Sequence, residues 1–377
     1  MILTEEQRQI RDTTRVFAQR ELSPYAAERE ERAEIPRAVL VAMGELGLMG
    51  MTVPAEYDGA AADNVSYALA LMEIAAGDGA ISTVMSGHNS VGCSIVQKAG
   101  TEAQKQTYLR PMAMGKMLSC FCLTEHTGGS DVAAMRSTAT RTATGWRLNG
   151  QKQFITSGAI ADVAIVFAKT DPQAGRRGIS AFILPTNTPG YRVGRREKKM
   201  GQNASDTVEV FFENLDIPAD ALLGTEGDGF RIAVSNLVGG RIGIAAQSVG
   251  MARDALERAV AYAKERTSFG APIITHQAVS FRLADMAASL QAAAQLVLYA
   301  AALADAGEDC LMEASMAKLV ASETAERVCS DAIQTFGGNG YMQEYAVERI
   351  YRAVRVTKIY EGSNDIQRLV ISRALAK

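Results

Sequence analysis

MLSCFCLTE, residues 117–125, is an apolar run at which the composition of the chain changes from helix-forming to strand-forming. Side chains alternate between the two faces of a strand, so Cys120 and Cys122 are predicted to point to one face as buried thiols. Further short runs of the same kind, separated by Gly, Pro, Asn and Asp, are DVAIVFAKT (162–170), GISAFILP (178–185) and DTVEVFFENLDIP (206–218). The middle third of the chain is therefore predicted to be a β domain.

An asparagine–glycine pair, Asn149-Gly150, lies inside another such run, WRLNGQKQFIT (146–156). Asn-Gly favours the backbone of a two-residue hairpin turn. We therefore expect a hairpin at this pair and an antiparallel arrangement of the strands.

The flanking thirds are rich in helix-forming residues. One apolar stripe has alternating spacings of four and three, which is typical of a helix in a bundle; it consists of Val279, Leu283, Met286, Leu290, Ala293 and Val297. A second long helix is predicted over about 311–335. The predicted fold is mainly α with a central β domain: a helical domain (1–116), a β domain (117–227) and a helical bundle domain (228–377).

Composition argues against several classes of protein. The chain has 377 residues, 47% of them hydrophobic, and a net charge of −3 without a long basic block, so we expect no nucleic-acid partner. The sequence contains no run of about 18 apolar residues, so no membrane span is predicted. The N-terminus starts as a helix without a signal sequence or basic presequence, which favours a cytoplasmic bacterial protein.

Cysteine and histidine usage argues against structural cross-links. The five cysteines are odd in number and irregularly spaced, so a disulfide framework is not expected. The three histidines lie far apart in the sequence, and no metal site is predicted.

Three glycine-rich or polar loops are candidates for ligand binding. FCLTEHTGGSD (121–131) offers small residues and free N–H groups to a flat or anionic ligand, although an ordinary exit from a strand would look the same. QTFGGNGY (334–341) contains three glycines. One of them can end a helix in the left-handed region, and the other two would allow the backbone to approach a ligand closely. RTSFGAPIITHQ (266–277) is an inter-helix loop that combines a charge, a hydroxyl, a ring and an amide.

Two charges lie in apolar surroundings. Arg241, in GGRIGIAAQ (239–247), needs an anionic or carbonyl partner, either within the protein or on a ligand. Glu361, in KIYEGSNDIQRL (358–369), is either a solvated loop acid or a base that faces an apolar cavity.

Taken in order, LTE..GGSD, NGQKQFITSG, RTSFG with THQ, QTFGGNGY and IYEGSNDIQRL resemble the acyl-CoA dehydrogenase family, most of all its short-chain and short branched-chain members. The resemblance implies an N-terminal helical domain, a β-barrel-like middle domain and a C-terminal four-helix bundle. It also implies a homotetramer with one FAD per subunit. Such enzymes desaturate an acyl-CoA thioester between its α and β carbons and pass electrons to an electron-transferring flavoprotein.

The resemblance also assigns roles to residues. Glu361 matches the catalytic base, which takes the α-proton while the β-hydride moves to the flavin. Acyl-CoA contacts match Ser130, Arg241 and Gly362. FAD contacts match Phe121, Leu123, Thr124, Gly129, Ser130, Phe154, Ile155, Thr156, Arg266, Ser268, Phe269, Gln277, Gln334, Gly337, Gly338, Ser363, Asn364 and Asp365. The residues from 266 to 277 and from 334 to 338 match positions that hold FAD across a subunit interface.

Some positions depart from the family pattern. His126 stands where relatives usually have proline, Phe154 where many have tryptophan, and Val238 where an acidic residue is common. A few branches carry the base next to the arginine, but Gly240 occupies that place here, which leaves Glu361 without a competitor. The acyl group of the substrate cannot be predicted from these residues.

Two other functions are compatible with the same fold. An oxidase or monooxygenase is one alternative, although nitroalkane-oxidising relatives use aspartate instead of glutamate and acyl-CoA oxidases are usually longer. A catalytically silent, FAD-bound assembly subunit is the other, and it would be expected to lose the base or the Ser130 loop. Both are present in this sequence.

Overall fold

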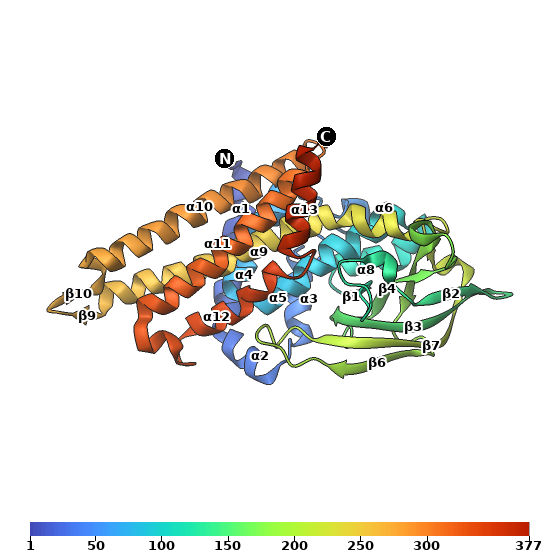
Figure 1. The fold of residues 1–377 in the computed structure, drawn as a ribbon, viewed down its shortest axis with the longest axis horizontal. Coiled ribbons are helices and arrows are strands. Elements are labelled where there is room, and N and C mark those ends of the chain that lie inside the picture. The colour runs from blue at the N-terminus through green and yellow to red at the C-terminus, as the bar shows by residue number, and fades with distance from the viewer. Residues whose placement is uncertain (377) are drawn as a thin grey trace.

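Helical, β and helical regions follow one another along the chain in the computed structural model, which describes residues 1–376 (Figure 1). The first and last regions lie together as one body of helices, and the strands form a sheet at one end of it. The predicted fold class, mainly α with a central β domain, is confirmed.

The N-terminal helices are built around α4 and α5, which are buried on almost every side. Asp63 caps α4 by accepting from Ser66 N at 2.6 Å, and Asp78 caps α5 in the same way. A π-helical segment, His88–Cys93, joins α5 to α6. The helices are α1 (Glu5–Phe17), α2 (Ala26–Arg32), α3 (Arg37–Glu45), α4 (Asn64–Gly77), α5 (Gly79–Gly87), α6 (Ser94–Ala99), α7 (Glu102–Gln104) and α8 (Arg110–Ala113).

The central sheet has the strand order β6-β7-β3-β2-β4-β5-β8, and β1 pairs with β4. Most pairs are antiparallel, as expected, but β1 and β2 both run parallel to β4, which the prediction of an antiparallel domain did not include. The strands are β1 (Ser119–Cys122), β2 (Thr138–Arg141), β3 (Gly145–Thr156), β4 (Val163–Lys169), β5 (Ile179–Pro185), β6 (Tyr191–Arg196), β7 (Thr207–Pro218) and β8 (Leu222–Leu223).

Strand β4 is buried on both faces, which explains its continuous apolar sequence. Ile165 and Phe167 pack toward the N-terminal helices, while Val166 packs into the second core on the other side of the sheet. Cys120 and Cys122 join that second core from β1, with their sulfurs 3.8 Å apart, so both are buried thiols on one face as predicted.

The hairpin expected at Asn149-Gly150 does not form. Residues 145–156 are one continuous strand, β3, whose register against β7 shifts between Leu148 and Gly150. Between these two pairings β3 has one residue and β7 has two, so the pair lies opposite a β-bulge in β7 rather than in a turn. Pairing with β7 outweighs the local turn preference.

Three long helices, α9 (Gly229–Glu265), α10 (Gln277–Asp305) and α11 (Leu311–Phe336), form the C-terminal bundle with α12 (Ala346–Val354) and α13 (Asn364–Leu375). A small hairpin of β9 (Thr267–Ser268) and β10 (Ala271–Pro272) joins α9 to α10. The predicted stripe is buried from Leu283 to Val297, and the helix expected over 311–335 is α11. Gly337 ends α11 with a φ of +61°.

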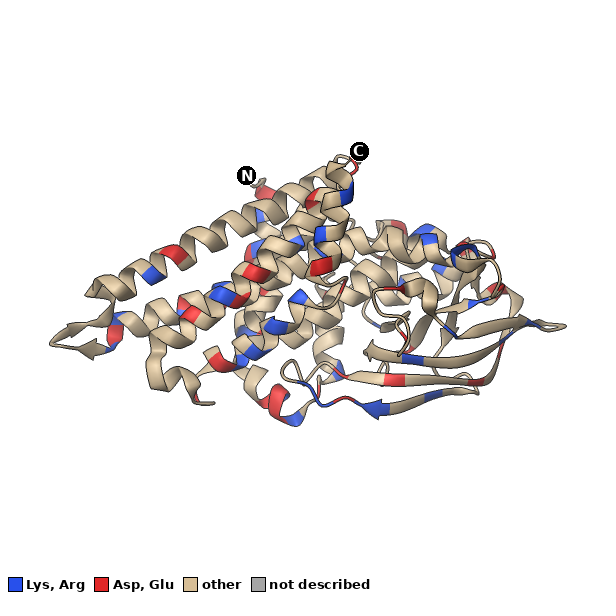
Figure 2. Ribbon diagram, in the orientation of Figure 1, with Lys and Arg blue, Asp and Glu red and all other residues tan. Residues whose placement is uncertain are grey.

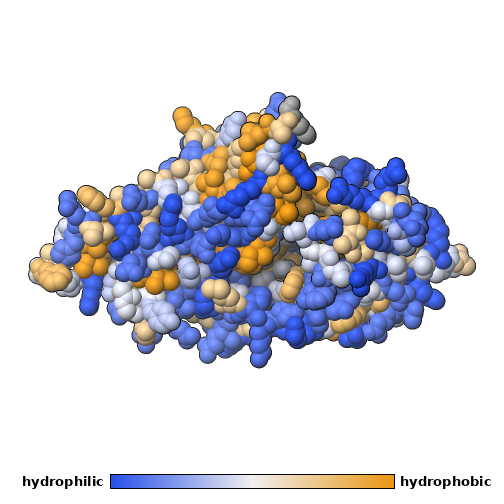
Figure 3. Space-filling view, in the orientation of Figure 1, coloured by the Kyte–Doolittle hydropathy of each residue, from blue (hydrophilic) through white to orange (hydrophobic). Residues whose placement is uncertain are grey.

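Within residues 1–376, only α10 is long and apolar enough to cross a membrane, judged by length and composition. Its buried stripe packs against α9, α11 and α4, so one face of the helix belongs to the bundle. Charges of both signs are interspersed over the helices (Figure 2). On the face shown in Figure 3, apolar residues gather where the bundle meets the β region.

Candidate active site

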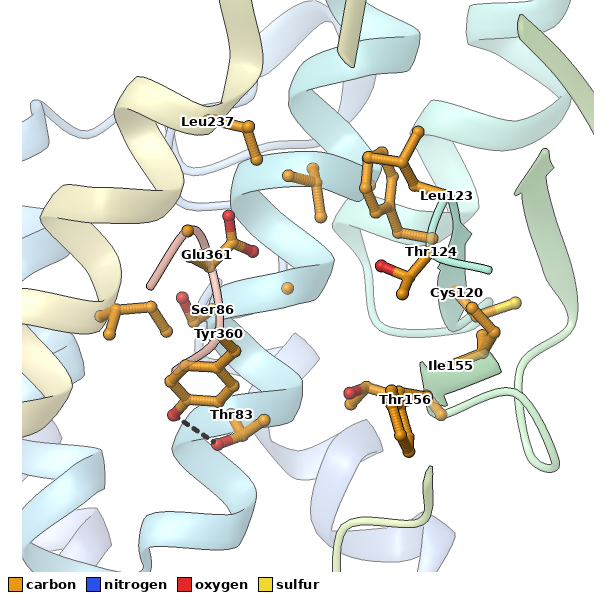
Figure 4. Close-up of a pocket in the computed structure, with 18 of the residues that line it drawn as sticks. Thr83, Ser86, Cys120, Leu123, Thr124, Ile155, Thr156, Leu237, Tyr360 and Glu361 are labelled. Carbon is orange, nitrogen blue, oxygen red and sulfur yellow. Dashed lines mark hydrogen bonds between the residues drawn. The ribbon is translucent and has the colours of Figure 1, made fainter. Parts of the chain in front are cut away.

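A cavity of about 260 Å³ lies between the helices and the sheet. Its walls come from α5, α9, β1, the end of β3 and the loop before α13. Figure 4 shows Glu361 and Leu237 on one side, facing Leu123 and Thr124 on the other. Segments that are more than 200 residues apart in the sequence therefore meet at one site.

The loop that carries Glu361 has an unusual backbone. Glu361 has a φ of +54° and Gly362 a φ of +86°, so two successive residues lie in the left-handed region. For a glutamate this conformation costs on the order of 1–3 kcal/mol, and such strain tends to occur at functional sites. Gln367 Nε2 donates to the carbonyl oxygens of Gly362 at 2.8 Å and Glu361 at 3.3 Å, which holds the turn in place.

The Glu361 carboxyl group is enclosed at the cavity wall. The residue is half-buried because one side lines the cavity, but Oε2 is buried and has no hydrogen-bond partner among residues 1–376. Gly240 lies directly behind it, since a Cβ on that glycine would lie 2.6 Å from Oε2. Burial raises the pKa of Glu361 to about 7, against the opposing effects of Arg241 and Lys318.

Arg241 on α9 is the basic residue predicted to need a partner. It is buried, its guanidinium donates to Ser315 Oγ at 3.2 Å, and its Nε is without a partner within residues 1–376. Burial lowers its pKa, while the charge of Glu361 opposes that shift. Arg241 also lines the cavity, so it places a positive charge at the cavity wall.

A buried polar network supports one wall of the cavity. The Tyr360 hydroxyl donates to Gln247 Oε1, and Gln247 Nε2 donates to Thr83 Oγ1 at 2.6 Å and Ser82 Oγ at 2.8 Å. Gln247 is fully buried, and Thr83 and Tyr360 line the cavity. Because these groups satisfy one another, they hold this part of the cavity wall in place.

On the sheet side, an ion pair fixes the loop after β1. Lys152 on β3 is fully buried, and its Nζ donates to Glu125 Oε1 at 2.7 Å and to Leu123 O at 3.2 Å. Glu125 also accepts from Ser137 N at 3.1 Å, and Gln153 N donates to Thr124 O at 2.9 Å. The two wall segments, 121–130 and 154–156, are thus tied together.

A buried histidine supports the same wall from the helical side. His88 Nδ1 accepts from Ser119 N at 3.2 Å, and Nε2 lies 3.0 Å from Met112 O. This arrangement requires the proton on Nε2, and burial lowers the pKa of His88 to about 4. The imidazole is therefore neutral and links the π-helical segment to β1.

The structure brings about half of the predicted site residues together. The cavity is lined by Phe121, Leu123, Thr124, Gly129, Ser130, Phe154, Ile155, Thr156, Arg241, Glu361 and Gly362. Ser363 instead caps α13, Asn364 is buried against α11, and Asp365 points to solvent. Their roles in binding FAD or acyl-CoA stay predictions.

A second group of predicted residues lies exposed at the far end of the bundle, away from the cavity (Figure 1). It comprises Arg266, Ser268, Phe269, Gln277, Gln334, Gly337 and Gly338. Phe269 is 97% exposed with a φ of +51°, which is unusual for a large aromatic residue. One copy of the chain does not bring this group to its own cavity.

Sequence reasoning missed several residues of the site. Thr83, His88 and Gln247 carry no motif, since α5 and α9 look like ordinary apolar helices. Lys318 gives a signal of the kind that drew attention to Arg241, a lone charge in an apolar helical run (SMAKLVAS, 315–322). No group of three or more His, Cys, Asp or Glu within residues 1–376 is arranged to hold a metal ion.

Comparison with known proteins decides the family. The N-terminal, middle and C-terminal domains described for acyl-CoA dehydrogenases match residues 4–116, 120–215 and 227–376 in that order. The chain belongs to the acyl-CoA dehydrogenase family. This confirms the resemblance that the five sequence segments indicated.

Individual acyl-CoA dehydrogenases are similar over the full chain. The mitochondrial short-chain specific enzyme of Bos taurus is 44% identical over 375 residues, covering 100% of this chain and 91% of that protein. Butyryl-CoA dehydrogenase from Megasphaera elsdenii superposes with a TM-score of 0.98 at 40% identity, covering 100% of both chains. A chain solved in work on the electron transferring flavoprotein of Acidaminococcus fermentans gives a TM-score of 0.99 at 44% identity, covering 100% and 99%.

Proposed function

We propose that the chain catalyses the FAD-dependent α,β-desaturation of a short acyl-CoA thioester, with Glu361 as the base. The observation that carries this proposal is the enclosed Glu361 carboxyl group at the wall of an otherwise largely apolar cavity. A thioester α-proton is weakly acidic, so the base must have a raised pKa and the developing enolate must be stabilised. Burial supplies the first requirement, because it raises the pKa of Glu361 to about 7.

The residues on the sheet side fit FAD. Phe154 is a large aromatic that is 57% exposed on the wall with a φ of +58°, and beside it lie the small residues of the Gly129–Ser130 loop. An exposed ring and free backbone groups suit a flat, polar-edged cofactor. Segments 121–130 and 154–156 would hold the cofactor. Bound FAD would accept the hydride that leaves the β carbon.

A short acyl group is supported by two observations. Thr83 and Tyr360, which are tied together through Gln247, form part of the wall of a cavity of about 260 Å³, and similar proteins are named for short-chain substrates and for butyryl-CoA. We expect butyryl-CoA to bleach the flavin absorbance under anaerobic conditions faster than octanoyl-CoA does. A faster reaction with octanoyl-CoA would contradict the short-chain assignment, and no bleaching by any acyl-CoA would contradict the desaturation itself.

We propose further that the active form is a homotetramer that passes its electrons to an electron-transferring flavoprotein. Exposed aromatic side chains at the end of the bundle, Phe269, Phe281 and Tyr341, favour burial against another copy. The similarity to a chain from work on such a flavoprotein supports the electron acceptor. Hydrogen peroxide in stoichiometric amount without an added acceptor would instead indicate an oxidase.

The pH dependence of the reaction should report Glu361. The base acts as a carboxylate, and burial raises its pKa to about 7, so protonation at lower pH removes the active form. We expect kcat/KM for butyryl-CoA to fall about tenfold per pH unit below about pH 7. Initial rates at constant ionic strength measure this. If kcat/KM instead fell only near pH 4.3, which is about the pKa of an exposed glutamate, the assignment would be contradicted.

A further inference from the structure

Lys318 is a fully buried lysine next to the candidate active site. It lies on α11, outside the cavity lining, and burial lowers its pKa to about 7, opposed by the charge of Glu361. A buried ammonium group without a carboxylate partner is costly. Within residues 1–376 its hydrogen bond goes to an amide, Asn364 Oδ1, at 2.9 Å.

Asn364 connects this lysine to the loop that carries Glu361. It is buried, and it lies three residues after Glu361 at the start of α13. Its Oδ1 also accepts from Ser322 Oγ at 3.2 Å, so two side chains of α11 donate to the Asn364 amide oxygen. The glutamate has a left-handed backbone, which persists only where the surroundings hold it.

We propose that Lys318 is a positioning residue for Glu361: it fixes the loop through Asn364 and adds a basic group near the carboxylate. This inference rests on the proposed function of Glu361 as a base. Gln367 holds the carbonyl side of the same turn, and Lys318 holds the side that leads into α13. The two contacts together keep the carboxylate directed into the cavity.

The charged and titratable groups around this pair come from several elements. Glu361 is affected by Arg241 and Lys318, and it acts in turn on Tyr67 and Tyr360. Lys318 is affected by Glu361, Arg241, Glu323 and Lys358. Because Glu361 and Lys318 both titrate near neutral pH, they should do so as a coupled pair. Removal of the lysine leaves the carboxylate with less positive charge nearby, so the pKa of Glu361 should rise.

The test separates proton abstraction from oxidation. In 3-thiabutanoyl-CoA a sulfur replaces the β carbon, so no hydride can leave, and exchange of the α-proton with D2O reports the base alone. The FAD-loaded wild-type protein should exchange this proton. The exchange rate should fall at acid pH with an apparent pKa near 7. We expect Lys318→Met to raise this apparent pKa by about one pH unit. Exchange at pH 7 should then fall about fivefold, because the ionised fraction of Glu361 drops from about one half to about one tenth, with little change in half-saturation.

Controls make the outcomes distinct. Lys98→Met removes another lysine that donates to an asparagine, at 3.4 Å, and should leave the profile unchanged. Should Lys318→Met fail to fold, Asn364→Ser removes the acceptor while the lysine stays, and should slow exchange at least fivefold. A folded Lys318→Met or Asn364→Ser protein whose profile superimposes on that of the wild type overturns the proposal. No exchange by the wild type would refute the proposed function instead.

Discussion

Replacement of Glu361 by glutamine is expected to lower the rate of butyryl-CoA desaturation by about 10³-fold or more, while the protein still folds and binds FAD. Glutamine has nearly the same shape but cannot accept the α-proton. The buried Oε2 has no hydrogen-bond partner among residues 1–376, so the substitution breaks no contact there.

Anaerobic bleaching of the flavin by butyryl-CoA in a stopped-flow instrument measures the effect. The visible spectrum and the melting temperature show whether the Glu361→Gln protein is folded and loaded. Glu361→Asp is the matched variant, since it keeps the carboxylate but withdraws it by one methylene, and its loss should be smaller. Near wild-type bleaching by the glutamine variant would exclude Glu361 as the base.

Features that depend on local sequence could be predicted. The apolar stripe from Leu283 to Val297 fixes which face of α10 is buried, because a helix repeats its face every three to four residues. Cys120 and Cys122 are likewise placed by the alternation of one strand. Glu361 could be singled out because a lone charge between apolar residues and a glycine is unusual.

Features that depend on long-range pairing could not be predicted. Asn149-Gly150 has the local preference of a turn, yet Gly150 pairs with Phe212 and the strand continues. Pairing of β1 with β4 brings Ser119 opposite Val163, and nothing in either segment specifies the parallel direction. Such contacts are set by the whole sheet rather than by a short window of sequence.

The support of the site was also hidden from the sequence. Gln247 and Thr83 lie on different helices and belong to the site because α5 packs against α9. Asn364 is predicted to contact the cofactor, but its burial against α11, where Lys318 donates to it, gave no signal in the sequence. The residues that hold the site in place lie behind it, and only the packing of helices identifies them.

The turn at Gly362 limits how far the base can move. Gly362 has a φ of +86°, and a Cβ there would lie 2.7 Å from Gln367 Nε2. Real Cβ atoms do not approach other atoms so closely. Gln367 is fully buried and donates to the carbonyl oxygens on both sides of this position, so its amide cannot give way without losing these bonds.

Gly362→Ala is therefore expected to lower kcat for butyryl-CoA by about 10²-fold, since the neighbouring Glu361 carboxylate must shift and misplacement by about 1 Å can cost this much. Gly307→Ala is the matched control, because Gly307 has a φ of +73° with nothing within 4 Å of its Cβ position. Both variants carry backbone strain of about 1 kcal/mol, and the clash with Gln367 adds a further loss of thermal stability in Gly362→Ala. Only Gly362→Ala should lose turnover. Steady-state kinetics and thermal unfolding of both proteins measure this. Equal activity in the two variants would show that the turn does not position the base.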